Sequence, residues 1–210
     1  MTGLLIVGAG GHGKVVADTA CEMGRWNKVA FVDDRYPSLT EVFCWPVIGR
    51  FDEIEPLLSE YSDIAVAIGN NHLRIDLLKR FMAMGFSLPA VIHPTAFVSS
   101  RSEINDGVVI FAHAVINVGA EIGLGCIINT ATTVDHDCIL SEGVHLSPGV
   151  NLAGEVSIGS CSWLGVGSSV IQKIEIGNNV IVGAGAAVIS DIVSNVTVVG
   201  VPAKVIKKNT

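Results

Sequence analysis

The second half of the chain places an aliphatic residue at every sixth position. Glycine often follows this residue, and the residue two places before it is mostly small or β-branched. A fixed short period is typical of solenoid proteins, in which each repeat adds one strand and one turn. Three such strands close a coil of about 18 residues, which predicts a triangular β-helix of roughly five to six coils. The seventeen repeat positions, all of them Ile, Leu or Val, are Ile92, Val98, Ile104, Ile110, Ile116, Ile122, Ile128, Val134, Leu140, Leu146, Leu152, Ile158, Leu164, Val170, Ile176, Val182 and Val188.

The first part of the chain has a different hydrophobic pattern, which predicts buried strands alternating with amphipathic helices. Continuous apolar runs at residues 4–7, 29–32 and 64–68 are typical of strands in a parallel sheet. Apolar residues at helical spacing follow the first and third runs and predict two helices. We therefore expect a Rossmann-like α/β half-domain over residues 1–86, followed by an all-β domain with a C-terminal tail over residues 87–210. The helical positions are Val16, Ala20 and Met23, then Ile75, Leu78 and Met82 before a stop at Gly85.

Composition and charge narrow the class of protein. Half of the residues (50%) are hydrophobic but only 6% are aromatic, which suits a coil whose interior has little room for rings. The formal net charge of −7 argues against a nucleic-acid binder. No apolar run approaches the ~18 residues of a membrane span, and the N-terminus does not resemble a signal peptide. Five cysteines without a C-x-x-C pair indicate free thiols. We expect a cytoplasmic protein with no nucleic-acid or membrane partner.

Four motifs accompany the repeat. They are GAGGHGKVVAD at residues 8–18, AIGNN at residues 67–71, NTATTVDHD at residues 129–137 and GVPAK at residues 200–204. With these motifs the chain resembles the nucleotide-amino-sugar N-acetyltransferases and the sialic-acid O-acetyltransferase-like group beside them, both hexapeptide-repeat enzymes. The resemblance implies a left-handed parallel β-helix, acetyl-CoA as co-substrate and no metal. It also implies a homotrimer with active sites between subunits.

His136 is the candidate general base for acetyl transfer. Imidazole titrates near neutral pH, and a neighbouring carboxylate can fix its tautomer and stabilise the imidazolium. The resemblance places the catalytic histidine at His136 and its acidic partner at Asp137, where some relatives have the longer Glu. The alternative is a histidine in a polar surface turn. Cys138 could be proposed as an acyl-carrying nucleophile, but it occupies the small inward position of its repeat, so we expect a buried thiol and direct attack by the amine.

The resemblance also assigns residues near acetyl-CoA. His145 matches a family histidine near this co-substrate, and Gly154 matches a position whose backbone amide can face the thioester. Gly165 and Gly183 are candidates along the pantetheine, and Asn129 matches a position that lines the site. A surface histidine, glycines common to the repeat and an asparagine in a turn are the structural alternatives.

A G-x-G-x-x-G pattern runs from Gly8 to Gly13, after the first predicted strand and before the first helix. Backbone amides and a helix N-terminus bind phosphates in such turns. Asp33 follows at the distance of the ribose carboxylate in NAD sites, so the motif leaves NAD open. Against NAD, the half-domain is short, and the resemblance favours a nucleotide sugar. The predicted substrate-binding residues are Gly10, His12, Gly13, Asp33, Asp34, Gly69 and Asn70, and Lys14 could pair with phosphate.

The leading hypothesis is acetyl transfer from acetyl-CoA to the amine of a UDP-4-amino-sugar. The nearer alternative is O-acetylation of a sialic-acid-like sugar. A zinc hydro-lyase using His113, His136 and His145 is a third possibility, although these histidines do not share one coil spacing. A non-catalytic nucleotide-sugar binder is the fourth.

Overall fold

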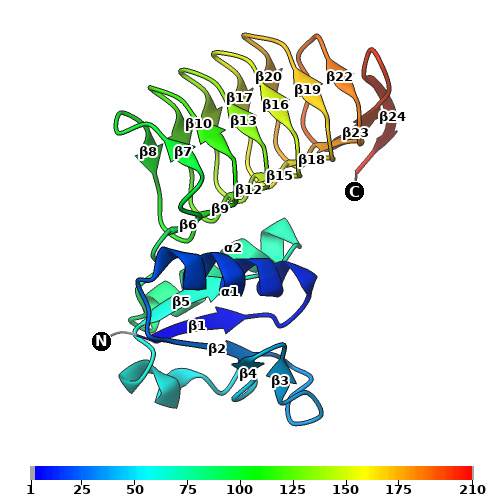
Figure 1. Cartoon of the computed structure of the whole chain (residues 1–210). Coiled ribbons are helices and arrows are strands. Elements are labelled where there is room, and N and C mark those ends of the chain that lie inside the picture. The colour runs from blue at the N-terminus through cyan, green and yellow to red at the C-terminus, as the bar shows by residue number, and fades with distance from the viewer. Residues whose placement is uncertain (1–2, 210) are drawn as a thin grey trace.

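The computed structural model describes residues 3–209, which form an N-terminal α/β unit beneath a β-helix (Figure 1). In the α/β unit, β1 (Gly3–Val7) lies between β2 (Lys28–Val32) and β5 (Asp63–Val66), and all three strands are parallel. Helix α1 (Gly11–Met23) follows β1 and helix α2 (Asn71–Ala83) follows β5. A hairpin of β3 (Glu41–Val42) and β4 (Trp45–Pro46) and the 3-10 helix η1 (Glu55–Ser59) lie between β2 and β5. The predicted parallel sheet and its helices are confirmed.

The turn between β1 and α1 needs glycine for two separate reasons. Gly8 has φ of +100°, which side chains rarely adopt. At Gly13 a Cβ would lie 2.0 Å from the carbonyl oxygen of Gly8 and 3.1 Å from the Phe31 ring. Glycine there lets α1 pack closely on the sheet and bury Val16 and Ala20 completely.

Helix α2 forms where predicted, but its buried face is rotated from the predicted one. Ile75 and Leu78 are buried as expected, whereas Met82 is 44% exposed. Phe81 and the fully buried Arg74 complete the inner face instead. Arg74, Leu78 and Phe81 are still spaced as one face of a helix. Because Arg74 is charged, a search for apolar residues at helical spacing overlooks this face.

The β-helix follows the six-residue repeat without a break. Each two-residue strand from β6 to β22 ends on one of the predicted aliphatic residues, and each strand pairs in parallel with the strand 18 residues away. The strands are β6 (Val91–Ile92), β7 (Phe97–Val98), β8 (Glu103–Ile104), β9 (Val109–Ile110), β10 (Val115–Ile116), β11 (Glu121–Ile122), β12 (Ile127–Ile128), β13 (Thr133–Val134), β14 (Ile139–Leu140), β15 (His145–Leu146), β16 (Asn151–Leu152), β17 (Ser157–Ile158), β18 (Trp163–Leu164), β19 (Ser169–Val170), β20 (Glu175–Ile176), β21 (Ile181–Val182) and β22 (Ala187–Val188).

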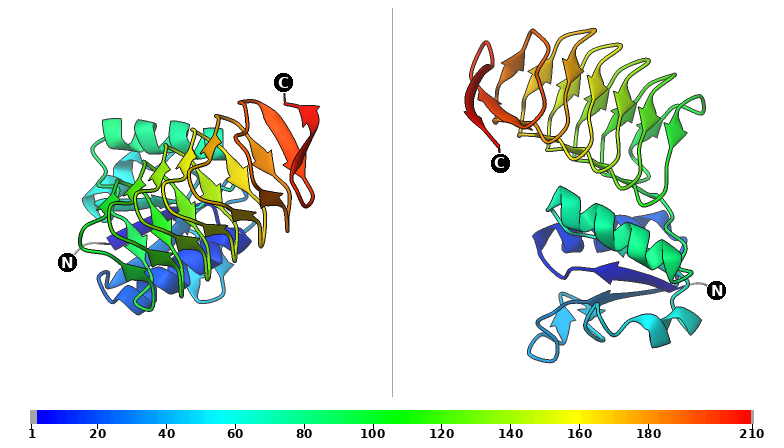
Figure 2. Two further views of the ribbon diagram at one scale, coloured as in Figure 1. Left: turned by 90° about the horizontal axis from the view of Figure 1, so that it is seen from above. Right: turned by 180° about the vertical axis from the view of Figure 1, so that it is seen from behind.

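Three parallel sheets make the faces of a triangular prism (Figure 2). The first face contains β6, β9, β12, β15, β18 and β21, and it continues into β23 (Val196–Val199) and the antiparallel β24 (Lys204–Lys208). The second face runs from β7 to β22 and the third from β8 to β20, every third strand in each case. The predicted architecture, an α/β half-domain followed by a parallel β-helix, is therefore confirmed.

Stacked aliphatic and small residues fill the interior of the prism. Ile116, Ile122 and Ile128 are completely buried, and so are the small residues Ala114 and Ala120 two places before a repeat position. Each fully buried Ile or Leu contributes about 1.5–3 kcal/mol of hydrophobic free energy. Because a small residue alternates with each branched one, aromatic rings are largely absent from this core.

The N-terminal unit packs against the first face of the prism. Val109, Phe111 and Ile127 belong to the same apolar cluster as α1. From α2, the Arg74 guanidinium donates hydrogen bonds to the carbonyl oxygens of Gly125 (2.8 Å) and Gly143 (2.9 Å), which lie in two successive turns of the prism. The described helices include none that is long and apolar enough to cross a membrane.

Candidate active site

His136 and Asp137 form a hydrogen-bonded pair in the turn between β13 and β14. His136 Nδ1 lies 2.9 Å from an Asp137 carboxylate oxygen, and Asp137 has the left-handed φ of +57°. The His136 backbone N–H donates to Asp135 (2.8 Å), whose carboxylate also accepts a hydrogen bond from Asn117 (2.9 Å). Because Nδ1 is engaged with Asp137, the neutral imidazole presents Nε2 as its basic nitrogen.

Negative charge around His136 favours its protonated form. The hydrogen bond to Asp137 raises the pKa of His136, and the charges of Asp135, Asp137 and Glu155 add to this effect. The side chain is 48% exposed, so solvent and substrate can reach it. His136 and Asp137 are thus paired in the way that a general base and its orienting carboxylate require, and their catalytic role stays a prediction.

Gly154 lies directly against the His136 imidazole, one coil further along the same corner. A Cβ at position 154 would lie 2.4 Å from Nε2 of His136, so only glycine leaves the ring its present position. No described residue accepts a hydrogen bond from the Gly154 N–H, and the Gly154 carbonyl accepts one from the Lys173 N–H (3.0 Å). A free backbone donor therefore lies in the corner that holds the basic nitrogen.

His145 lies on the first face of the prism, in a different environment. Nε2 of His145 lies 3.0 Å from the Asn129 side-chain amide, which also donates to the Leu146 carbonyl (3.1 Å). The ring stacks on Trp163 with centroids 5.4 Å apart. Burial, and then the charges of Arg74 and His12, lower the pKa of His145 to about 3. His145 is consequently neutral and suited to hydrogen bonding rather than to proton transfer near pH 7.

The Asn129 side-chain amide determines which ring nitrogen of His145 carries the proton. Since the Asn129 amide nitrogen is a donor, Nε2 accepts and Nδ1 carries the proton. Nδ1 is buried, and no acceptor for it lies within the described residues. Asn129 therefore fixes the tautomer of His145 and leaves its buried Nδ1–H without an acceptor among the described residues.

A cleft of about 600 Å³ opens between the first face and the start of α2. Its lining includes Gly69 and Asn70 from the end of β5 together with His145 and Trp163 from the prism. Asn70 also caps α2, since its side chain accepts a hydrogen bond from the Leu73 N–H (3.0 Å). The fold thus brings predicted substrate residues of the N-terminal unit to the same cleft as His145.

The glycine-rich turn has the geometry of a phosphate cradle. Gly10 is the N-cap of α1 and provides no side-chain acceptor for the helix, and open space lies where side chains would project from Gly10 and Gly11. The first N–H of α1 that is hydrogen-bonded within the described residues is that of Lys14, which donates to Gly10 (3.1 Å). The amides before it are free to bind an anion.

His12 adds a buried polar atom beside this turn. Its ring meets Phe111 edge to face at 5.6 Å, and its Nε2 has no hydrogen-bond partner among the described residues. Burial, and then the charge of Arg74, lower the pKa of His12 to about 4. His12 is consequently neutral near pH 7 and holds a buried ring nitrogen that is unpartnered within residues 3–209.

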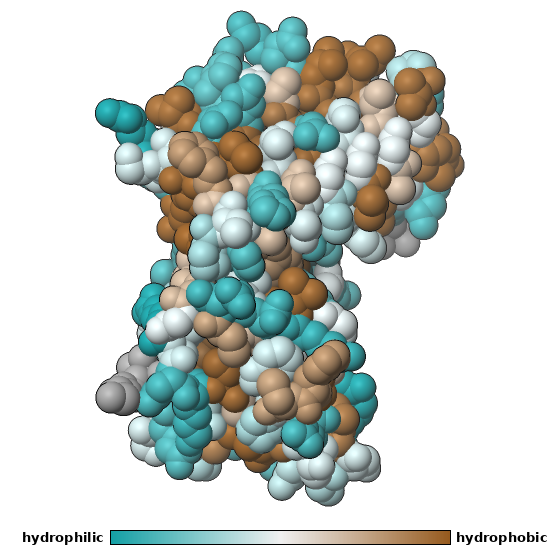
Figure 3. Space-filling view, in the orientation of Figure 1, coloured by the Kyte–Doolittle hydropathy of each residue, from teal (hydrophilic) through white to brown (hydrophobic). Residues whose placement is uncertain are grey.

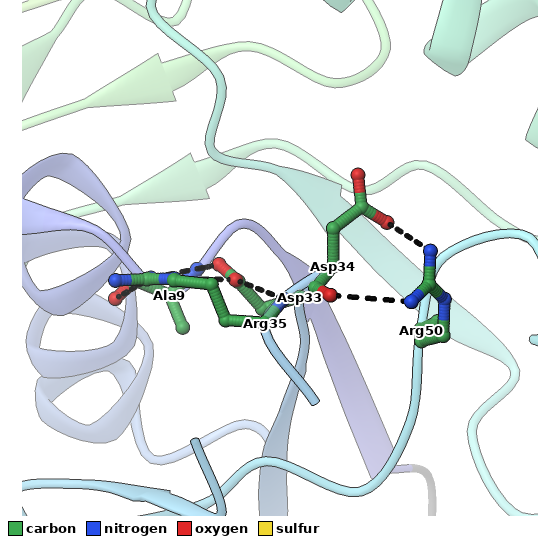
Figure 4. Close-up of polar contacts among 5 residues, drawn as sticks. All are labelled: Ala9, Asp33, Asp34, Arg35 and Arg50. Atoms are coloured by element: carbon green, nitrogen blue, oxygen red, sulfur yellow. Dashed lines mark hydrogen bonds and ion pairs between the residues drawn. The ribbon is translucent and has the colours of Figure 1, made fainter. Parts of the chain in front are cut away.

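Asp33 makes bonds within the protein rather than presenting a free carboxylate (Figure 4). One carboxylate oxygen accepts the Ala9 N–H (2.8 Å), and Arg35 binds both oxygens at 2.7 and 2.9 Å. The hydrogen bond from Arg35 is the main reason that the pKa of Asp33 falls to about 2. Asp34 is exposed, and its carboxylate lies 3.9 Å from Arg50. Asp33 thus anchors the glycine-rich turn, and Asp34 is the freer of the two carboxylates.

Gly165 and Gly183 have close neighbours in adjoining segments. A Cβ on Gly165 would lie 2.7 Å from the backbone nitrogen of Ala184, and one on Gly183 would lie 2.7 Å from Val199. Both glycines are required for stacking of the coils. Their contact with pantetheine stays a prediction.

His136 and His145 lie on opposite sides of the prism. His136 stands where the second face passes into the third, and in a triangular prism that corner is opposite the first face. His145, the glycine-rich turn and the 600 Å³ cleft all adjoin the first face. In Figure 1 the turns after β13 and its neighbours point away from α1 and α2. A single chain therefore does not bring the basic nitrogen of His136 to its own 600 Å³ cleft. The described residues also contain no cluster of His, Cys, Asp or Glu side chains that could hold a metal ion.

Sequence reasoning overlooked Arg35, Arg74 and Trp163. Arg74 stands at an inward helical position of α2, and its charge beside Ile75 and Leu78 was the available signal. Arg35 follows the acidic pair at the end of β2 by one residue, which is close enough to pair with it. Trp163 lies 18 residues after His145, so the coil spacing alone predicts that the two rings stack.

Known proteins match the chain over nearly its whole length. The structure of the acetyltransferase domain of PglB from Neisseria gonorrhoeae FA1090 is 43% identical and covers 98% of this chain and 100% of its own, with a TM-score of 0.94. The chain belongs to the hexapeptide-repeat β-helix acetyltransferases. Residues 3–81 also match the family described as PglD N-terminal domain. The resemblance inferred from the repeat and the four motifs is confirmed.

Two further relatives of the chain are sugar-nucleotide acetyltransferases or bind a sugar nucleotide. PerB from Caulobacter crescentus, solved in complex with CoA and GDP-perosamine, is 42% identical and covers 99% of this chain and 98% of its own, with a TM-score of 0.92. UDP-N-acetylbacillosamine N-acetyltransferase from Bacillus subtilis is 38% identical over 114 residues. Those residues are 53% of this chain and 52% of that relative, so the chain spans about half the length of the curated protein it matches.

Proposed function

We propose that this protein transfers an acetyl group from acetyl-CoA to the amino group of a nucleotide-linked amino sugar. The observation that carries the proposal is the His136–Asp137 pair, which presents an accessible basic nitrogen at a prism corner of an acetyltransferase fold. The complexes of relatives with acetyl-CoA, and with CoA and GDP-perosamine, support the two substrates.

The chemistry is direct acyl transfer with His136 as general base. As the neutral amine attacks the thioester carbonyl, Nε2 of His136 accepts one of the amine protons. The tetrahedral intermediate collapses to the amide, and the C–S bond breaks. The CoA thiolate leaves and takes up the proton from the imidazolium, so the base returns to its starting state. The free Gly154 N–H is the candidate donor to the oxyanion that forms at the carbonyl oxygen.

The N-terminal unit supplies the site for the nucleotide sugar. Free amides of the glycine-rich turn hold the diphosphate, with Gly10 at the N-cap of α1 and His12 beside it. Gly69, Asn70 and His145 line the cleft through which the sugar extends. Asp34 is the carboxylate left to contact the ribose or the base, because Arg35 and Ala9 occupy Asp33.

The active site forms between subunits of a homotrimer. His136 lies on the far side of its own prism from the cleft, so the base must come from a second copy. Exposed apolar side chains on the prism offer an interface for that copy, and Figure 3 shows such brown patches over the β-helix half of the molecule. The exposed apolar side chains of the β-helix include Val118, Ile139, Val166 and Ile171.

Subunit mixing tests the shared site. His136→Ala and His145→Ala each remove a residue from a different side of the prism, so a mixed trimer contains some sites with both histidines intact. We expect two poorly active variants to regain activity when they are refolded together. Absence of recovery in trimers shown to be mixed would mean that both histidines of a site come from one chain.

The acetyl acceptor is tested by substrate comparison. Release of CoA thiol is measured with UDP- and GDP-linked 4-amino sugars and with a free sialic acid. We expect turnover with an amino-sugar nucleotide, the UDP form first, and a decrease of about 10²–10⁴-fold in kcat for His136→Ala. His113→Ala, at another exposed corner, is the matched control. Turnover of sialic acid alone would establish O-acetylation instead, and an unchanged His136→Ala enzyme would exclude this base.

A further inference from the structure

We propose that Asn117, which lies one coil before the turn that carries His136, is a positioning residue for that histidine. This inference rests on the proposed function, because it names a side chain that orients the general base of that reaction. Asn117 acts indirectly, through the carboxylate of Asp135. Its loss should therefore slow the chemical step and leave the affinity for both substrates unchanged.

The stacking of the coils places Asn117 beside Asp135. Strands β10 and β13 pair in parallel with Ile116 opposite Val134, and each of the two polar residues follows its strand directly. The Asn117 backbone N–H donates to the Val134 carbonyl (3.0 Å), which fixes the main chain where both turns begin. The repeat therefore brings the two polar side chains together at the corner that carries His136.

A single carboxylate oxygen joins Asn117 to the backbone of His136. Oδ1 of Asp135 accepts the Asn117 side-chain N–H at 2.9 Å and the His136 backbone N–H at 2.8 Å. Only the NH₂ end of the amide can face a carboxylate, since both groups otherwise present acceptors. Two hydrogen bonds in series thus hold the main chain of His136 to the preceding coil, whose Ala114 and Ile116 side chains are completely buried.

The same preceding turn also supports the second carboxylate beside His136. The Asp137 backbone N–H donates to the Val118 carbonyl (3.2 Å). A Cβ on Gly119 would lie 2.4 Å from an Asp137 carboxylate oxygen, so this carboxylate lies directly against the glycine. Residues 117–119 therefore contact the residues on both sides of His136, and the earlier coil determines where both carboxylates lie.

The hydrogen bond from Asn117 also favours the charged form of Asp135. The His136 backbone N–H, and then the Asn117 side chain, lower the pKa of Asp135. Its negative charge joins those of Asp137 and Glu155 in raising the pKa of His136. A change of charge at position 117 should consequently appear in the titration of His136, which an asparagine that only stabilises the coil would not affect.

Two substitutions separate the effects of geometry and charge. Asn117→Asp keeps the shape of the side chain but replaces the donor with a second carboxylate, whereas Asn117→Ala only removes the hydrogen bond. Asn105→Ala is the matched control, because Asn105 also follows its strand directly but donates to a main-chain carbonyl, that of Ile122 (3.0 Å). Release of CoA thiol from acetyl-CoA is measured with the UDP- or GDP-linked 4-amino sugar that the unaltered protein accepts, and NMR titration follows His136.

Both Asn117 variants should lose activity through kcat. We expect kcat to fall about tenfold or more, while KM for acetyl-CoA and for the amino-sugar nucleotide changes less than about twofold. In Asn117→Asp the added negative charge should also raise the pKa of His136 and move the acidic limb of kcat/KM to higher pH. In Asn117→Ala that limb should move little, because Asp135 stays ionised near neutral pH. Asn105→Ala should match the unaltered protein in every measurement.

Each other outcome overturns the inference in its own way. Failure of the unaltered protein to acetylate any amino-sugar nucleotide would exclude the proposed function itself. An active parent with normal kcat and an unmoved His136 titration in both Asn117 variants would exclude Asn117 alone. A raised KM with normal kcat would mean that Asn117 contacts a substrate. A loss that matched Asn105→Ala, or that followed only a lower melting temperature, would show that Asn117 merely stabilises the coil.

Discussion

Gly154 and His136 occupy the same prism corner in successive coils, so closely that a Cβ on the glycine would lie 2.4 Å from the basic nitrogen. The repeat creates this relationship, because residues 18 apart stack on one another along each edge. The position of the proposed general base is therefore determined by the absence of a side chain one coil away.

Gly154→Ala should displace the imidazole while leaving the protein folded. The clash involves an exposed ring, which can rotate away, so we expect a small change in melting temperature and a decrease of about 10²-fold or more in kcat. Steady-state kinetics and thermal melting measure the two quantities. Gln172→Ala, at the same corner one coil further on, should change neither. Full activity in Gly154→Ala would show that the observed ring position is not the productive one.

Asp137→Asn should shift the pH dependence of the reaction. The hydrogen bond to Asp137 is the largest cause of the raised pKa of His136, so its loss lowers that pKa. A base must be unprotonated to act, and the acidic limb of kcat/KM should therefore move to lower pH while kcat falls.

Glu155→Gln provides the matched comparison for this shift. Glu155 raises the pKa of His136 through its charge alone, and its effect is smaller than those of Asp135 and Asp137. We expect a shift in the same direction but smaller, with kcat nearly unchanged. An acidic limb that stayed in place in Asp137→Asn would mean that another group controls it.

Cys138→Ala should retain activity within a few-fold. Cys138 is completely buried, its thiol donates to the Ala153 carbonyl (3.2 Å), and burial raises its pKa, so the thiolate form is disfavoured. Mass spectrometry of the enzyme with acetyl-CoA should detect no acetylated Cys138. Loss of activity in a folded Cys138→Ala protein, together with an acetylated thiol in the parent, would establish a covalent route instead.

The sequence predicts the prism better than it predicts the site. Each Ile, Leu or Val of the repeat has the same surroundings as the one before it, so periodicity alone locates all seventeen strands. His136 was likewise identifiable because its carboxylate partner is the next residue. Asp33 was different, because its partner Arg35 redirects it from a ligand to the glycine-rich turn. Side-chain geometry decides which groups pair across a turn, and the spacing of residues in the sequence does not reveal that geometry.

The spacing of the motifs also did not predict that His136 and His145 lie on opposite sides of the prism. His136 and His145 are nine positions apart in the sequence, which suggests that they lie close together. In a triangular coil, however, nine residues pass from one corner almost to the opposite face. The N-terminal unit then selects one of three faces to pack against, and buried Arg74 and Phe111 make that choice through contacts between distant segments.

Arg74→Met should destabilise the protein by roughly 2–4 kcal/mol. The guanidinium donates to the carbonyls of Gly125, Gly143 and Ile68, and methionine would leave these buried acceptors without donors. Denaturant unfolding measures the change, with Arg80→Met on the exposed side of α2 as control. Since the charge of Arg74 lowers the pKa of His145, its removal should also raise that pKa, which NMR titration can follow. Unchanged stability would show that the N-terminal unit does not depend on this contact.

Asp33→Asn should lower the free energy of unfolding at neutral pH and alter its acid dependence. The folded pKa of Asp33 is about 2, against 3.8 for an unperturbed carboxyl, so the carboxylate stabilises the fold above pH 3.8. This stabilisation is on the order of 2 kcal/mol and should disappear as the pH falls from about 4 to about 2. Unfolding curves of the unaltered protein and Asp33→Asn should therefore differ by that amount at pH 6 and converge near pH 2. Asp34→Asn, which removes an exposed carboxylate 3.9 Å from Arg50, should change stability by less than about 1 kcal/mol. If the stability difference between the unaltered protein and Asp33→Asn stayed constant at all pH values, it would not depend on the charge of Asp33. The ion pair with Arg35 would then not be the source of the stabilisation.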